Sequence, residues 1–203
     1  MTKQQMLPGF ADPVHHSQQW YRALLNAMSR PGTVCAPCGE AMPQQVPAPC
    51  SPAAAGVALT LLDHETPVWL QQPESPLAHW LQFHCGCPLT HRPEDAAFAV
   101  ITDSNTVPDW SRFATGTPEY PDRSATLIIQ VQSAAAAGPV TLQGPGIQKE
   151  AHISVSGLAD AFWTMHQANA ALFPQGTDTI LAAPEGVLCL PRTVRIRRQT
   201  TCM

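Results

Sequence analysis

Two apolar runs limit the folds that this chain can adopt. Residues 97–102 and 125–132 carry mainly apolar side chains at consecutive positions, and turn residues bound each run. A strand with this pattern is normally covered on both of its faces, as in the sheets of α/β proteins. A shorter run of the same kind spans residues 67–70. We expect all three segments to be buried strands.

Helix start signals lie before and between these runs. Asp12, Ser51 and Ser75 each precede a proline, the pair of residues preferred at the N-cap and the first helical position. Apolar residues at helical spacing follow each pair, so three helices are predicted. Two further helices are expected, a short one and a longer one, at residues 108–113 and 158–170.

The last third of the chain has the pattern of β-hairpins. Its turn sequences are Gly144-Pro145-Gly146, between residues 140–143 and 147–155, and Pro184-Glu185-Gly186, between residues 177–183 and 187–190. A final segment, 194–197, alternates arginine with apolar residues. We therefore predict one domain, residues 1–203, of the α/β class, with a mixed sheet covered by helices on both faces.

The charge composition favours a protein partner or a small anion over nucleic acid. Hydrophobic residues make up 44% of the chain and charged residues 13%, so part of the apolar surface is expected to meet another chain. The net charge of −4 includes four arginines, so the rest of the chain carries −8; they are Arg192, Arg195, Arg197 and Arg198. Nucleic-acid binding needs a broad basic face instead.

Neither a membrane span nor a disulfide framework is expected. The chain has no apolar stretch near the roughly 20 residues that a membrane helix needs, and its first ten residues lack a signal-peptide core. We expect a cytoplasmic protein. Its seven cysteines are then expected to be thiols.

A set of short motifs runs in order along these segments. The motifs are Tyr21-Arg22-x-Leu-Leu-x-Ala-Met28 with Pro31-Gly32, Leu59-Thr-Leu-x-Asp63, Thr66-Pro-Val-Trp-Leu70, Phe83-His84 with Pro88-Leu89, Thr115-Gly-Thr117, Ala125-Thr-Leu-Ile128, Gly144-Pro-Gly-Ile147, Phe173-Pro-x-Gly-x-Asp178 with Ile180-Leu181, and Pro191-Arg-Thr193. No single motif is specific, but in their joint order over nearly the whole chain they resemble the PhnH family of proteins from the phosphonate carbon-phosphorus lyase machinery.

The resemblance implies a fold similar to the large domain of pyridoxal-phosphate-dependent transferases, without that cofactor. It also implies a homodimer that joins the G, I and J subunits of the carbon-phosphorus lyase core complex. That complex forms α-D-ribose 1-methylphosphonate 5-triphosphate from ATP and methylphosphonate, and the chemistry is usually placed on the I subunit. The resemblance thus implies a required component that is not a catalyst alone.

Six residues are candidates for contacts with an anion or substrate. Arg192, held between Pro191 and Thr193, is the leading one, because its planar guanidinium suits a phosphate or carboxylate. The others, each with a structural alternative, are Arg22 (an internal or dimer salt bridge), His84 (a helix C-terminal cap instead of an acid or base), Gly144 and Gly146 (a hairpin turn instead of a phosphate loop), and Asp178 (a carboxylate that accepts backbone donors).

Two other kinds of site are considered. A pyridoxal-phosphate enzyme needs a lysine for the Schiff base, and the only lysines are Lys3, in the N-terminal tail, and Lys149, just after a turn. Cys35 and Cys38 have the spacing of half a zinc site, but they lie in a proline-rich connection with no second pair of that spacing. We therefore expect no cofactor and no metal. An independent small-molecule-binding enzyme and a zinc-stabilised binding module remain the alternatives.

Overall fold

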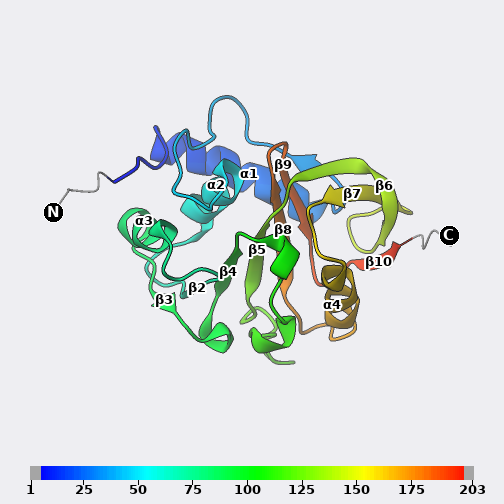
Figure 1. The fold of residues 1–203 in the computed structure, drawn as a ribbon. Helices are drawn as coiled ribbons and strands as arrows, with labels where there is room; N and C mark the ends of the chain where they lie inside the picture. Colours follow the sequence, from blue (N-terminus) through cyan, green and yellow to red (C-terminus); the bar gives the residue numbers. More distant parts are fainter. Residues whose placement is uncertain (1–5, 199–203) are drawn as a thin grey trace.

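Each of the three predicted serine or aspartate and proline pairs starts a helix in the computed structural model, which describes residues 6–198 (Figure 1). The helices are α1 (Pro13–Ser29), α2 (Pro52–Leu61) and α3 (Pro76–Cys85). At α1 and α2 the cap side chain accepts a backbone N–H, at 3.1 Å for Asp12 and 3.2 Å for Ser51. These bonds satisfy amides that have no partner within the helix.

The predicted buried strands form the centre of a seven-stranded mixed sheet. Its order is β1-β9-β8-β5-β4-β2-β3. Neighbouring strands from β3 to β8 are parallel, whereas β9 is antiparallel to both β8 and β1. The strands are β1 (Val34–Cys35), β2 (Val68–Leu70), β3 (Leu89–Thr90), β4 (Phe98–Ile101), β5 (Thr126–Gln130), β8 (Asp178–Ala183) and β9 (Gly186–Leu190).

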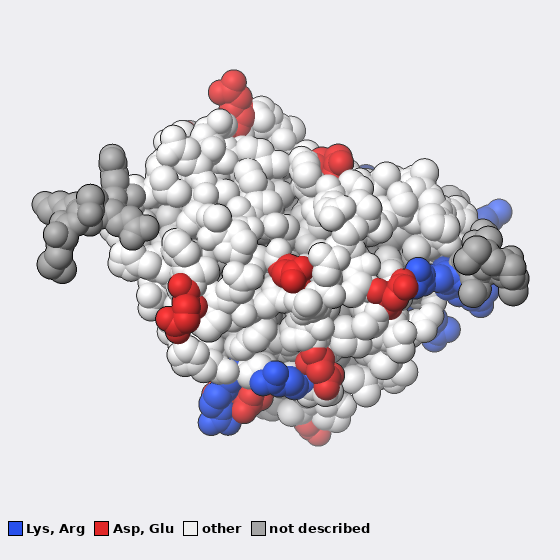
Figure 2. All heavy atoms as spheres, in the orientation of Figure 1, with Lys and Arg blue, Asp and Glu red and all other residues white. Residues whose placement is uncertain are grey.

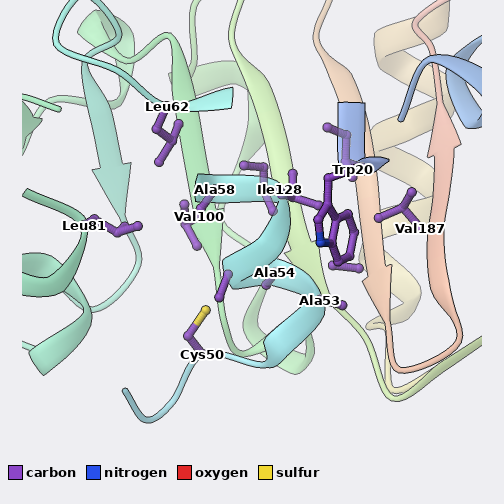
Figure 3. Packing of buried hydrophobic residues seen from close by; sticks show 14 of the residues in the cluster. Trp20, Cys50, Ala53, Ala54, Ala58, Leu62, Leu81, Val100, Ile128 and Val187 are labelled. Carbon is purple, nitrogen blue, oxygen red and sulfur yellow. The ribbon is translucent and has the colours of Figure 1, made fainter. Parts of the chain in front are cut away.

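One face of the large sheet is covered by helices, as predicted. α2 lies across its middle, where Ala54 and Ala58 pack near Val100 and Ile128, and Trp20 of α1 packs beside them (Figure 3). Small residues on α2 let it approach both the sheet and α1, and a Cβ at Gly56 would collide with the Trp20 indole. The indole N–H donates to the carbonyl of Ala41 at 2.9 Å, so this buried polar atom is satisfied.

The other face differs from the prediction of helices on both sides. A three-stranded antiparallel sheet, ordered β10-β6-β7, packs there together with the single helix α4 (Asp160–Ala170). Its strands are β6 (Ser133–Gln143), β7 (Ala151–Ser156) and β10 (Arg195–Arg198). The hairpin predicted around Gly144 is present, but it forms a second layer because the inward side chains of Leu142 and Ile153 join the core of the large sheet.

Several boundaries also differ from the sequence prediction. The segment expected as a short helix at 108–113 contains only a 3₁₀ turn, Trp110–Arg112, and two more 3₁₀ turns occur at Pro93–Asp95 and Ser104–Thr106. β1 and β3 each have two residues, too few for a periodic pattern. Among the described residues, no helix combines the length and hydropathy needed to cross a bilayer.

Candidate functional site

Arg192 and Asp178 form an ion pair at the edge of the large sheet where the parallel strands begin. Asp178 is the first residue of β8, and Arg192 follows the end of β9 by two residues. Arg192 Nη2 lies 2.6 Å from Asp178 Oδ2, while Nε and the backbone N–H of Arg192 lie 3.2 and 2.8 Å from Oδ1. Arg192 and Asp178, both named as candidates from the sequence, therefore bind each other.

The remaining contacts of Arg192 are also internal. Nη1 donates to the carbonyl of Pro121 and Nη2 to Ser124 Oγ, both at 2.6 Å. Four of the five guanidinium N–H groups therefore have partners within the chain. The side chain is only 14% exposed, which leaves one N–H for an external anion. This geometry supports a structural role more directly than the expected anion contact.

The Arg192–Asp178 cluster, defined as these two residues with Pro121 and Ser124, is joined to other motifs of the sequence. The backbone of Thr115 pairs with that of Ser124, and its carbonyl accepts the N–H of Gly176 at 2.8 Å. Asn169 of α4 brackets Thr177 with a bond to its N–H at 2.7 Å and another to its carbonyl at 2.9 Å. Segments from four parts of the chain are thus cross-linked at this edge.

A buried histidine that sequence reasoning did not single out lies close to this cluster. His166 of α4 is fully buried, and neither ring nitrogen has a hydrogen-bond partner in the described part of the chain. Its ring packs near those of Trp110 and Phe162. Desolvation lowers the pKa of His166 to about 4, an effect that the charge of Asp178 opposes. The ring is therefore neutral at pH 7.

His84 lies elsewhere and holds the N-terminal segment. Its Nε2 is 2.9 Å from the carbonyl oxygen of Leu7, and Trp80 Nε1 lies 3.0 Å from the same oxygen. A carbonyl can only accept, so the His84 nitrogen must donate. His84 is not the cap of α3 either, since the capping residue after Cys85 is Gly86, which has the left-handed conformation with φ of 68°.

We expect His84→Phe to loosen the N-terminal segment while the core stays intact. The change keeps a flat ring but removes one of two donors to Leu7, so the free energy of unfolding should fall by about 1 kcal/mol. Amide hydrogen exchange followed by mass spectrometry should show faster exchange at residues 7–10. Unchanged exchange there would contradict the role given to His84.

The remaining candidates do not converge with Arg192. Arg22 is exposed on α1 and makes no ion pair within residues 6–198. Gly144 and Gly146 lie in the turn between β6 and β7, which is the hairpin alternative. A Cβ at Gly146 would collide with the carbonyl of Ser29, so close packing against the end of α1 explains the glycine there.

The alternative sites gain no support from the structure. In the part of the chain that the structure describes, no three His, Cys, Asp or Glu residues are grouped closely enough to hold a metal ion. Cys35 lies in β1 and Cys38 is exposed in the following connection. Lys149 is exposed in the turn after β6, and Lys3 lies outside the described residues.

Glutamine side chains close the opposite edge of the large sheet. From β2 the chain continues to β3 on one side of this neighbouring pair, and from β4 it continues to β5 on the other side. Sheets of this class usually bind ligands at such a point, between the two strands whose connections diverge. Gln71, directly after β2, makes hydrogen bonds of 2.8 to 3.1 Å with the backbone of residues 102–106. Gln130 at the end of β5 bonds the backbone of residues 49–51 in the same way. The chain's own loops thus use these polar groups.

Two hollows lie near this edge, on either side of the start of α3. Their volumes are about 510 and 450 Å³, and both are lined by Glu74, Ser75 and His79. None of the six candidates lines either hollow. Both are open, and the Ser75 hydroxyl donates to the carbonyl of Gln72 at 2.7 Å, not to His79. Glu74, Ser75 and His79 are therefore not linked as the acid, base and nucleophile of a catalytic set.

Comparison with known proteins agrees with the resemblance drawn from the motifs. Residues 8–197 match the family described as bacterial phosphonate metabolism protein (PhnH). A relative from Rhizobium meliloti (strain 1021), named alpha-D-ribose 1-methylphosphonate 5-triphosphate synthase subunit PhnH, is 42% identical over 192 residues, 94% of each chain. A relative from Stutzerimonas stutzeri, named putative C-P lyase subunit protein HtxG, is 34% identical over 102 residues, 50% of this chain and 52% of that protein. The chain therefore belongs to the PhnH family of bacterial phosphonate metabolism proteins.

Proposed function

We propose that this chain is a subunit of the complex that forms α-D-ribose 1-methylphosphonate 5-triphosphate from ATP and methylphosphonate. The observation that carries the proposal is the 42% identity to a subunit of that synthase over 94% of both chains. The second relative, named as a C-P lyase subunit, supports the same pathway. The chain thus acts in the breakdown of phosphonates.

The arrangement of polar groups supports a subunit that is not catalytic by itself. Arg192 and Asp178 neutralise each other and hold neighbouring loops. Gln71 and Gln130 use their amides on the backbone at the edge where a nucleotide would usually bind. The displacement of adenine is then the work of a partner subunit, and this chain needs neither pyridoxal phosphate nor a metal of its own.

The outer face of α1 supports association with other chains. Val14, Tyr21 and Leu25 are 76%, 51% and 53% exposed. Their spacing of seven and four residues places them on one face of the helix, opposite the buried Trp20 and Ala27. An exposed apolar stripe of this kind suits a subunit contact. We propose that the chain forms a homodimer and joins the G, I and J subunits in the cytoplasm.

Reconstitution of the synthase tests this function. We expect the purified chain to co-purify with the G, I and J subunits, and we expect ribose triphosphate product to form from ATP and methylphosphonate only when the chain is present. Product can be followed by phosphorus NMR. Full activity of the other subunits without this chain, or its failure to join them, would overturn the proposal. Activity of the chain alone would favour the alternative of an independent enzyme.

A further inference from the structure

The outer face of the small sheet carries positive charge that the described part of the chain does not neutralise. Arg195 and Arg197 occupy alternate positions of β10, so both side chains point away from the core. Both are exposed, and neither has an ion-pair partner among residues 6–198. Figure 2 shows basic side chains gathered at the end of the molecule near the C-terminus, with one acidic side chain beside them; a second basic group, at the lower edge of this view, lies among acidic side chains.

The strand register places side chains of β6 and β7 in line with the two arginines. Arg197 is opposite Thr141 of β6, which is opposite His152 of β7. Residues that face each other across strands share one side of the sheet, so these three side chains form a row. Arg195 is opposite Gln143, whose Nε2 donates to Glu150 at 2.8 Å. Thus an acidic group lies beside Gln143, and the Arg197 row has none.

A hollow with both polar and apolar lining residues adjoins Arg195. It lies between the end of α4 and β10 and has a volume of about 560 Å³; its lining includes Gln167, Ala170, Phe173 and Arg195. The side chain of Phe173 is 62% exposed, and that of its neighbour Leu172 is 49% exposed. Aromatic and arginine side chains placed together in this way are typical of the energetically important part of a protein interface.

The outer edge of β10 is already occupied by α4. Gln167 Nε2 donates to the carbonyl of Ile196 at 3.2 Å, and Arg198 forms an ion pair of 2.8 Å with Asp160 at the start of the helix. These contacts oppose the addition of another strand at this edge. A partner must therefore be recognised through side chains.

We propose that Arg195, Arg197, Leu172 and Phe173, with the hollow between α4 and β10, form a docking surface for an acidic segment of a partner protein. The segment would place an apolar side chain against Leu172 and Phe173 and carboxylates on the arginines. Alternate residues of a strand are about 7 Å apart, which matches carboxylates at alternate positions of an extended segment. A single phosphate group would instead need donors that converge on one point.

The inference rests on the proposed function, because the partner is a subunit of the synthase complex. The test compares Arg195→Glu/Arg197→Glu with the control Arg92→Glu/Arg112→Glu, which makes the same change in charge outside the small sheet. Arg92 is exposed just before one 3₁₀ turn, and Arg112 is exposed at the end of another. Binding of each purified variant to an immobilised G–I–J subcomplex is measured by interferometry at low and high salt. Urea unfolding confirms that all variants are folded.

We expect the first double variant to bind about 10 to 100 times more weakly at low salt, with a loss of the salt dependence seen for the unmodified chain. The control should bind within about threefold of the unmodified chain. Phe173→Ala should weaken binding at both salt concentrations, because its contribution is apolar.

Each other result has a separate meaning. If the unmodified chain does not bind the subcomplex, the proposed function fails. If the unmodified chain binds and the first double variant binds equally well, the docking surface is wrong and the function stands. Equal weakening in the control would show a general effect of charge and would also overturn the surface. Tripolyphosphate binding to the isolated chain that the first variant alone abolishes, with assembly unchanged, would make this face a small-anion site.

Discussion

Arg192→Lys is expected to lower the free energy of unfolding by about 2 to 4 kcal/mol. Lysine keeps the positive charge, but a single ammonium group cannot reach both oxygens of Asp178, the Pro121 carbonyl and Ser124 Oγ, which Arg192 contacts together. The carboxylate and the segment 121–124 would lose partners in a place that is mostly closed to water. Urea unfolding followed by circular dichroism measures the effect.

Arg197→Lys is the matched control for this prediction. Arg197 is exposed on β10, and no ion pair or hydrogen bond fixes it in the described structure. Its replacement should change the free energy of unfolding by less than about 0.5 kcal/mol. Equal stability of the Arg192 and Arg197 variants would show that the internal contacts of Arg192 do not stabilise the fold, and would return Arg192 to the role of a free anion contact.

The second large effect is a loss of stability in mild acid that depends on His166. Its pKa is about 4 in the folded chain, against about 6.5 for an unperturbed histidine. The unfolded chain therefore binds a proton below pH 6.5 that the folded chain does not bind until about pH 4. Above pH 6.5 the histidine is neutral in both states and does not lower the free energy of unfolding. As the pH drops to 4, protonation of the unfolded chain lowers this free energy by about 3 kcal/mol.

His166→Phe isolates this contribution. Phenylalanine has a similar shape and no ionisable group, so the free energy of unfolding of this variant should change much less between pH 6.5 and 4. The carboxylates that cap helices titrate in a lower pH range. Hydrogen bonds lower the pKa values of Asp12, Asp103 and Asp109 from 3.8, so the stability that these groups contribute is lost below the range used here. An unchanged slope in the variant would rule out His166 as the cause.

Local signals in the sequence predicted much of the fold. The pairs at Asp12, Ser51 and Ser75 each start a helix, because capping depends on residues within one turn. The two late hairpins also form where their turns predicted. Two-residue strands and the packing of the second hairpin layer depend on distant contacts, which no local pattern encodes.

The candidate site could be predicted only in part from the sequence. Arg192 and Asp178 were named separately, although the hairpin predicted around residues 184–186 already places them together: Thr179 is opposite Leu190, so Asp178 lies beside the start of the segment that carries Arg192. The contacts with Pro121 and Ser124 span about seventy residues and could not be inferred. His166 lies within the helix predicted at residues 158–170, but its isolation from hydrogen-bond partners is a property of the packed core.

The position of β10 in the topology affects how the chain can fold during its synthesis. β10 is the last described strand, and it pairs with β6, which is made more than fifty residues earlier. β5 likewise pairs with β8, which is made about fifty residues later. A nascent chain on the ribosome would expose one edge of β5 until β8 has been made, and the unpaired edge of β6 until β10 has been made. Such unpaired strands are sites of aggregation. The emergence of β10, and not that of β6, is therefore the earliest point at which this fold can be completed and the chain can be assembled with others.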